Sequence, residues 1–143
     1  SKERRLIMLP YTTFDYNSVE SLVARNRQTF SYYKERLNNH DRVHVNPEEK
    51  GTVNGYWMPT IGFNKMYGIV CEILMEAFAK GNIDARGFFW PLSAWDMFMD
   101  RKENIISWSA HERAINLPSY HNIDNEKQGR VISVILIIMN AKR

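Results

Sequence analysis

The chain has 143 residues, of which 44% are hydrophobic and 13% aromatic, enough to build one domain around a real core. Its net charge is only +3, and the basic residues are interleaved with acidic and apolar ones, so composition favours a solvated surface over a nucleic-acid footprint. The longest apolar run, Val131 to Met139, is too short to cross a membrane, and Cys71 is the only cysteine, which excludes an internal disulfide.

The first predicted element is a helix that begins at Ser18, a residue type that can cap the first turn. Residues 1–10 are basic and then apolar, and Pro10 would break any helix there, so we predict an N-terminal extension or linker over residues 1–17, before a domain at 18–143. We see no signal peptide in this stretch and expect a cytoplasmic protein. The apolar residues at helical spacing, up to a polar stop at Asn38 and Asn39, are Val19, Leu22, Val23, Phe30, Tyr33 and Leu37.

Two strands are predicted next. Within residues 42–46, Val43 and Val45 alternate with polar neighbours, which indicates a short strand with one face buried. Residues 56–63 are rich in aromatic and β-branched side chains but contain Pro59. Because proline lacks the amide that a sheet needs, this second strand lies at an edge, is bulged, or begins after Pro59.

The most regular stretch is a helix predicted between Asn64 and Gly81. Asn64 can accept hydrogen bonds from the first free amides, and Gly81 can take the left-handed conformation that ends a helix. Its apolar residues recur at three and four along one face. They are Met66, Ile69, Val70, Ile73, Leu74, Ala77 and Phe78. Phe88–Trp90 then form a predicted strand that stops at Pro91, which gives the order strand, helix, strand.

Beyond Pro91 the predicted elements are short until the C-terminal end. One helical turn is expected over 93–99, a helix over 104–114 with Trp108 packing inward, and a brief strand over 115–117. Asp124 is a good N-cap for a last helix that continues to about Ala141. Its residues 131–138 are apolar on nearly every side and often β-branched, so a buried strand is a competing interpretation.

Several of these stretches together resemble one family. They are YWMPTIGF at 56–63, GNIDARGFFWPLS at 81–93 and INLPSYHNI at 115–123, followed by the final helix. In this order they are similar to the C-terminal part of the pyridoxal-phosphate-dependent nucleotide-sugar aminotransferases of the DegT/DnrJ/StrS family, above all its perosamine-synthase-like branch. The similarity runs from about Val23 to the C-terminus, whereas residues 1–16 depart from the family.

The resemblance implies an α+β fold, in which a small antiparallel or mixed sheet of three to four strands packs against helices, like the C-terminal small domain of these enzymes. It also favours the helix over the strand at the C-terminal end. A helix that is apolar on nearly every side needs cover on both faces. We therefore expect a large pyridoxal-phosphate-binding domain or a second subunit as partner, within a homo-oligomer, and neither nucleic acid nor a membrane.

Pyridoxal phosphate chemistry needs a lysine that holds the cofactor, an acid beside the pyridine nitrogen, and a phosphate cradle of backbone amides. In the resembled family all three lie in the large N-terminal domain, and none can be assigned in this chain. We expect the chain alone to bind no cofactor and not to transaminate, with pyridoxal phosphate belonging to the parent enzyme. The histidines share no spacing with each other or with Cys71 that indicates a metal site.

Four residues are candidates for contact with substrate. The resemblance puts Arg86 in the family's GIDAR position, where its planar guanidinium could hold the carboxylate of glutamate or a diphosphate; a surface salt bridge is the alternative. Trp90 and Pro91 stand where an aromatic residue and a proline approach the sugar cleft of the family. His121 lies on a loop after Pro118, and an exposed histidine without function is the alternative there.

The aromatic strand end also allows a structural interpretation. Core packing on alternate faces is the favoured alternative for Phe88 and Phe89, and an equal one for Trp90. The family often has tyrosine at the position of Trp90, and more often Leu-Pro where this chain has Trp95 and Asp96, so the shape of the cleft is expected to differ.

Two functional hypotheses follow. In the first, the chain is the small C-terminal domain of a sugar aminotransferase, closing one side of the cleft and helping the enzyme to dimerise. In the second, it is a detached, non-catalytic module that kept the packing residues and serves in binding or assembly. A ferredoxin-like nucleic-acid binder is disfavoured because the aromatic residues lie on apolar faces and not among lysines.

Overall fold

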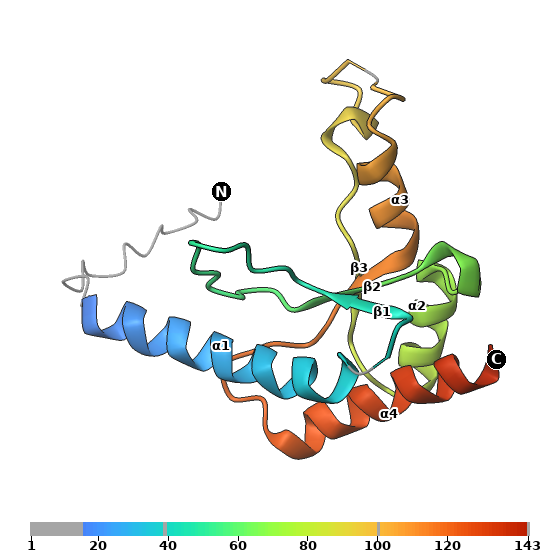
Figure 1. The fold of residues 1–143 in the computed structure, drawn as a ribbon. Coiled ribbons are helices and arrows are strands. Elements are labelled where there is room, and N and C mark those ends of the chain that lie inside the picture. The colour runs from blue at the N-terminus through green and yellow to red at the C-terminus, as the bar shows by residue number, and fades with distance from the viewer. Residues whose placement is uncertain (1–15, 39, 100, 143) are drawn as a thin grey trace, which may run out of the picture.

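The computed structural model describes residues 16–38, 40–99 and 101–142. They form a four-stranded antiparallel sheet in the order β1-β2-β4-β3, with helices packed against it (Figure 1). The α+β class and the strand number expected from the sequence are thereby confirmed. The elements in chain order are α1 (Tyr16–Leu37), β1 (Val43–Val45), β2 (Thr60–Phe63), η1 (Lys65–Tyr67), α2 (Cys71–Lys80), β3 (Arg86–Gly87), η2 (Leu92–Ala94), α3 (Ile105–Arg113), β4 (Ala114–Asn116) and α4 (Asn125–Ala141).

Helix α1 ends at Leu37 as predicted but begins two residues before Ser18. Ser18 therefore lies inside the helix and is not its N-cap, which corrects the predicted start. Its carbonyl accepts a hydrogen bond from the hydroxyl of Ser21 (2.9 Å). Packing of Tyr33 and Leu37 in the core holds the other end of the helix. Residues 1–15 of the predicted extension at 1–17 lie outside the described residues.

Strand β2 begins immediately after Pro59, which is one of the three positions that the sequence allowed. It is an interior strand, because Ile61 pairs with Val45 of β1 on one side and with Ile115 of β4 on the other. The carbonyl of Pro59 still accepts a hydrogen bond from the amide of Leu117 (2.8 Å). A proline just before the first strand residue costs the sheet no ladder bond, so it needs no bulge.

The predicted helix between Asn64 and Gly81 is not continuous, and Gly68 is the reason. Asn64 does cap, accepting a hydrogen bond from the Met66 amide (3.2 Å), but only the 3-10 turn η1 follows. Gly68 then takes a left-handed conformation with φ of 60°, and α2 starts afresh at Cys71. Because of this break, Met66 points into solvent and is 76% exposed, although its spacing predicted a place on the core face.

The end of α2 also differs from the prediction in its mechanism. Gly81 has φ of −77° and is not left-handed; the next residue, Asn82, takes that conformation with φ of 52°. Gly81 is instead required by close packing, because a Cβ added there would lie only 3.1 Å from Cγ2 of Val134 on α4. The glycine thus allows α2 and α4 to approach each other closely.

The last segment is a helix, so the competing strand is excluded. Asp124 caps α4 as predicted, its carboxylate accepting a hydrogen bond from the Lys127 amide (2.8 Å). In Figure 1, α4 lies beside α1 beneath the sheet, and the two helices are in contact. Ile135 is fully buried in this layer, while Ile137 points to solvent. None of the helices in the described part of the chain is long and apolar enough to cross a membrane.

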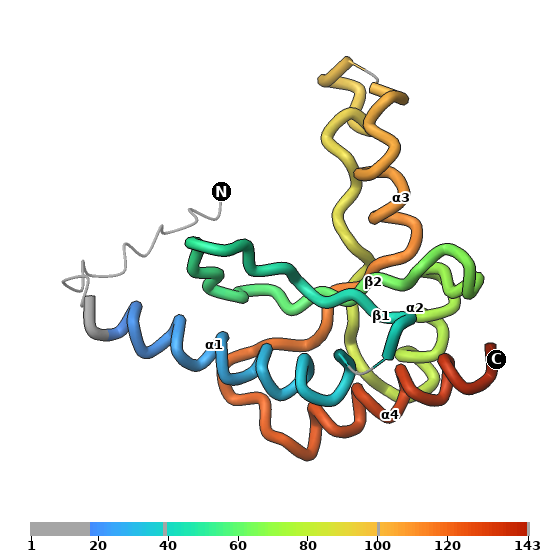
Figure 2. Tube along the Cα trace, in the orientation of Figure 1, coloured from blue at the N-terminus to red at the C-terminus, as the bar shows by residue number. Residues whose placement is uncertain are grey.

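The predicted strand over Phe88–Trp90 is the largest departure from expectation. Strand β3 holds only Arg86 and Gly87, and the amide of Phe88 makes one more bond, to the carbonyl of Ala114 (3.3 Å). The chain then leaves the sheet as an arm, by which we mean residues 88–99 and 101–113, and returns through α3 into β4. Figure 2 shows this arm standing out from the body of the domain. The expected turn over 93–99 shrinks to η2, and α3 and β4 lie within one residue of their predicted places.

Candidate functional site

The base of the arm is held together by a cluster of rings. Trp90 lies against His111, with ring centroids 3.7 Å apart, and meets Trp108 edge-on at 6.2 Å. His111 donates from Nδ1 to the carbonyl of Phe88 (2.9 Å), which ties α3 to the outgoing chain and fixes the tautomer of the ring. Trp108 is half-buried against Trp90 and lies outside the main core, so its predicted inward packing is local to the arm.

A second aromatic contact joins two segments that are far apart in the sequence. Trp57, in the loop before β2, stacks on Phe89 with centroids 6.4 Å apart and an angle of 25° between the rings. Trp57 is 67% exposed, Phe89 55% and Trp90 56%. The alternative of core packing is therefore wrong for Phe89, because this ring stands mostly in solvent. We call Trp57, Phe89 and Trp90 the aromatic surface.

The loop that carries Trp57 is fixed from behind. Tyr56 is buried in a left-handed conformation (φ 47°) and stacks on Phe30 of α1 at 3.6 Å, so that consecutive rings point in opposite directions. The Glu48 carboxylate accepts hydrogen bonds from Arg27 (2.9 Å) and from the Asn54 amide (2.8 Å). These bonds, Arg27 first, lower the pKa of Glu48 to about 2. Trp57 is thus presented on a preformed loop.

Cys71 lies behind the aromatic surface and is a packing residue. It is buried, and burial raises the pKa of its thiol above the ordinary value. Its sulfur fits so closely against β3 that a Cβ on Gly87 would lie 3.1 Å from Sγ. Cys71 therefore behaves as a small buried hydrophobe.

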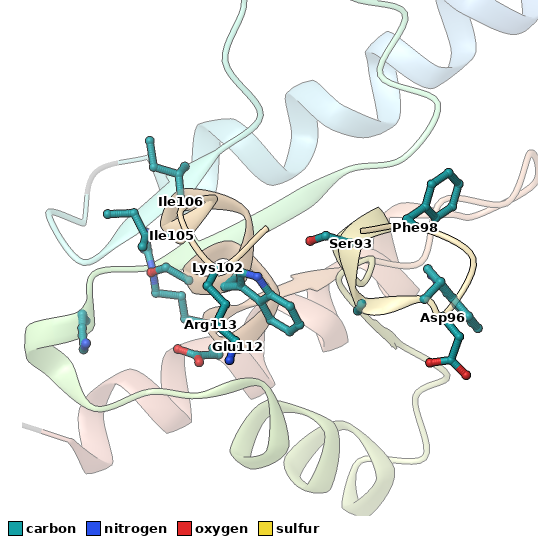
Figure 3. Close-up of a pocket in the computed structure, with 13 residues that line it drawn as sticks. Ser93, Asp96, Phe98, Lys102, Ile105, Ile106, Glu112 and Arg113 are labelled. Carbon is teal, nitrogen blue, oxygen red and sulfur yellow. The ribbon is translucent and has the colours of Figure 1, made fainter. Parts of the chain in front are cut away.

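A broad pocket of about 910 Å³ lies on the arm, and we call it the arm pocket. Figure 3 shows Ser93, Asp96 and Phe98 on one side of it and α3 on the other. The guanidinium of Arg113 is fixed by the Phe63 carbonyl (2.5 Å) and the Ser109 hydroxyl (2.9 Å). The hydroxyl oxygen of Ser93 is buried and has no hydrogen-bond partner among the described residues. The arm pocket is therefore an apolar hollow with one unsatisfied hydroxyl and a charged rim.

A second hollow of about 570 Å³, which we call the groove, lies between the sheet and α4. Arg86 of β3 lines it together with Pro118, Ser119 and Tyr120 of the loop after β4. That loop is held by the hydroxyl of Tyr33, which donates to the Pro118 carbonyl (2.8 Å). The groove shares no lining residue with the arm pocket or with the aromatic surface.

The four candidate substrate residues do not form one cluster. Trp90 and Pro91 lie at the base of the arm, where Pro91 is buried and Trp90 faces outward. Arg86 lines the groove, and its guanidinium makes neither a hydrogen bond nor an ion pair with any described residue, so the alternative of a surface salt bridge is excluded within that part of the chain. His121 is exposed beside the groove, and its carbonyl accepts a hydrogen bond from Nε of Arg25 (3.0 Å).

The partners of Trp90 are not among the sequence predictions. His111 lies three residues after Trp108 on one helix, a spacing that puts both rings on the same face. That spacing could have indicated that the two rings pack against a common partner. The contact of Trp57 with Phe89 had no comparable signal, because it joins separate segments.

The sequence profile of the DegT/DnrJ/EryC1/StrS aminotransferase family matches residues 15–136. This match covers most of the chain. The chain belongs to that family.

Two curated relatives agree with this membership. EpsN of Bacillus subtilis (strain 168), described as a candidate pyridoxal phosphate-dependent aminotransferase, is 28% identical over 124 residues, which are 82% of this chain and 31% of EpsN. The GDP-perosamine synthase of Escherichia coli O157:H7 is 28% identical over 109 residues, 76% of this chain and 29% of the synthase. The chain therefore spans about a third of the length of these members of the family.

Solved structures show the same fold. The aminotransferase TlmJ from Streptoalloteichus hindustanus superposes with a TM-score of 0.76 at 14% identity, over 89% of this chain and 34% of TlmJ. DesI, solved in the presence of its TDP-sugar product, gives 0.72 at 19% identity, over 88% of this chain and 33% of DesI. At such low sequence identities, the structural similarity is evidence for the fold alone.

The described residues do not fit the cofactor of this family. Six of the seven lysines in them are exposed, and the seventh, Lys34, is half-buried over the ring of Phe30. None is enclosed beside a carboxylate and a cradle of backbone amides, which pyridoxal phosphate requires. Likewise, no three His, Cys, Asp or Glu side chains within the described ranges are grouped so as to hold a metal ion.

Proposed function

We propose that the chain is the small C-terminal domain of a pyridoxal-phosphate-dependent sugar aminotransferase. The parent enzyme would move an amino group from glutamate to the keto carbon of a nucleotide-linked deoxysugar for polysaccharide biosynthesis in the cytoplasm. Membership of the family and the similarity to a GDP-perosamine synthase support this proposal. The chain is not catalytic by itself, because its described residues offer no lysine that fits the cofactor.

The observation that carries the proposal is the aromatic surface. Three large rings, one in the loop before β2 and two at the base of the arm, stand mostly exposed, although a folded domain normally buries such residues. They are nevertheless held in place, by the stacking of Trp57 on Phe89 and of Trp90 on His111. Rings that are ordered but uncovered are suited to contact with a partner domain or a sugar.

The partner in this proposal is a large pyridoxal-phosphate-binding domain, or a second subunit that supplies one, in a homo-oligomer. The cofactor, bound there, supplies the electron sink of the transfer. Trp90 and Pro91 close one side of the sugar cleft, and the buried Pro91 fixes the direction in which the arm leaves the sheet. Arg86 and His121 provide a cation and an imidazole at the other end of β3 for a carboxylate or phosphate of the substrates.

A detached, non-catalytic module is the alternative. The same lack of a suitable lysine supports it, since a module that works only in binding or assembly has no need of the cofactor. The two proposals differ in one measurable property, which is whether a cofactor-bearing domain gains activity from this chain.

The test is a reconstitution. A perosamine synthase truncated before its own small domain is mixed with this protein, pyridoxal phosphate and glutamate, and amino transfer to the keto sugar nucleotide is followed. We expect activity in the mixture and none from the protein alone, which also forms no yellow complex with the cofactor. A stable yellow complex with the protein alone would contradict the claim that it is not catalytic, and an inactive mixture would favour the detached module.

Trp90→Ala sharpens the test. Because Trp90 is half exposed, we expect a rise in KM for the sugar nucleotide in the active mixture and little change in the melting temperature. Thr52→Ala, an exposed position of the 47–55 loop, serves as the matched control and leaves KM unchanged. A fall of several degrees in melting temperature for Trp90→Ala would mean that the ring is a packing residue.

A further inference from the structure

The groove is the hollow into which Arg86 faces, and the inference drawn from it rests on the anion-binding role that the proposed function gives to this residue. It is built by four separate segments: Met58 before β2, the segment into β3, the end of β4 with the loop after it, and the first turns of α4.

The floor of the groove is apolar. Its accessible surface comes from Met58, Ile83 and Pro118, which are half-buried, and from the exposed Tyr120. Beneath them lie the buried Ala85, Leu117, Ile123 and Val131. Water in contact with such a floor is released when an apolar body covers it, which favours binding. The floor therefore suits a hydrocarbon or an aromatic ring.

The rim of the groove is mainly cationic. Arg86, Lys127 and Arg130 line it, and Asp84 is the carboxylate among the lining residues. Arg86 has all its guanidinium donors free of described partners. Arg130 makes one hydrogen bond, in which Nη2 donates to the Gly81 carbonyl (3.1 Å). Lys127 is held by Asp124 at 2.7 Å, so the two arginines are the available anion donors.

The walls are preformed. Arg25 reaches from α1 and donates to the carbonyls of His121 (3.0 Å) and Ile123 (2.5 Å), while Tyr33 holds Pro118. At the sheet side, the buried Asn116 accepts a hydrogen bond from the Thr60 hydroxyl (2.8 Å). A pocket with fixed walls loses little conformational entropy when a ligand binds.

We propose that the groove binds a small amphipathic oxyanion, with its carboxylate or phosphate on Arg86 and Arg130 and its apolar body against Met58, Ile83 and Tyr120. A guanidinium grips either anion through two parallel hydrogen bonds. This ligand is distinct from a sugar at the aromatic surface, because the two sites share no residue.

Two probes and two controls test the proposal on the full chain. The probes are 3-phenylpropionate and phenyl phosphate, and the controls are neutral 3-phenylpropanamide and inorganic phosphate. Amide chemical shifts are followed by NMR during each titration. We expect saturable shifts at residues 83–86 and 117–123 with at least one probe, and weaker binding of both controls. The tighter of the two probes tells whether the natural ligand is a carboxylate or a phosphate.

Substitutions of Arg86 test whether this residue binds the anion. Arg86→Gln should weaken binding of the tighter probe about tenfold or more, and Arg86→Lys should recover part of the loss, since lysine keeps the charge but not the fork. Arg101→Gln, an exposed arginine on the arm, is the control and leaves binding unchanged. Arg86 is exposed, so none of these variants should unfold the domain.

Three results would overturn the proposal. They are the absence of saturable shifts with either probe, equal binding of the neutral amide, and shifts confined to the arm. Amino transfer is measured separately in the reconstituted mixture, so a failure of the groove to bind an anion and a failure of the proposed function are distinguishable.

Discussion

The helical side of the sheet and the arm use the same residue types in opposite ways. Beneath the sheet, Phe78 and Ile135 are fully enclosed by neighbours from several elements. On the arm, Phe89, Trp95 and Ile106 are mostly exposed, and α3 contains no buried residue. Both regions are apolar, so apolar composition alone does not tell a core from a contact surface.

The difference shows that the two regions are stabilised by different interactions. The body of the domain is stabilised by burial of many side chains in one contiguous cluster. The arm keeps its shape through a few directed contacts, among them His111 with the Phe88 carbonyl and Arg113 with the Phe63 carbonyl. Side chains that do not stabilise the fold to which they belong are available for contact with a partner.

The largest expected effect comes from a matched pair of phenylalanines. Phe78→Ala removes a fully buried ring from α2 and should lower the free energy of unfolding by about 3 to 5 kcal/mol. Phe89→Ala removes a mostly exposed ring and should change it by no more than about 0.5 kcal/mol. Urea titration followed by circular dichroism measures both. Equal losses would erase the distinction between the two regions.

A smaller effect is expected at the break before α2. Gly68→Ala forces a side chain into a left-handed conformation and should cost about 1 kcal/mol, although nothing lies within 4 Å of the new Cβ. Gly55→Ala, equally open but without a positive φ, should be neutral or slightly stabilising. The same urea titration compares them. If Gly68→Ala is as stable as Gly55→Ala, backbone strain does not explain the break.

The smallest effect concerns pH and the loop that presents Trp57. The pKa of Glu48 is lowered to about 2 from an ordinary 4.5, so its contribution to stability is complete above pH 4.5 and is lost as pH falls towards 2. Glu48→Gln should therefore melt at a lower temperature than the parent at pH 6, with the difference shrinking below pH 4.5. Glu49→Gln, its exposed neighbour, should show no such difference. A constant difference across this range would refute the ion pair.

Much of the fold could be predicted because it follows from local patterns. The period of apolar residues located α1, and the cap residue Asp124 marked where α4 starts. The competing strand over residues 131–138 could not be excluded by periodicity, and the resemblance to the family decided it correctly. The position of Pro59 was narrowed to three choices by chemistry and fixed by the pairing of β2.

The failures have a common physical cause, which is that exposure is decided by tertiary packing. Met66 has the spacing of a core residue, but the left-handed Gly68 ends η1 before the helix can continue, and Met66 is left exposed. Phe88–Trp90 have strand propensity, yet β4 offers too few partners to extend β3 beyond Gly87. For the same reason the separation of Arg86 from Trp90, and the meeting of Trp57 with Phe89, could not be read from the sequence.

The most direct test of the central claim is the emission of the four tryptophans, since each of them lies in the aromatic surface or elsewhere on the arm. We predict long-wavelength emission from the protein alone, with a shift to shorter wavelength when the truncated perosamine synthase is added, because the partner domain would cover these rings. Trp57→Phe and Trp95→Phe should each remove part of the shift. Saturable binding with unchanged emission would contradict the account, because the partner would then occupy another face.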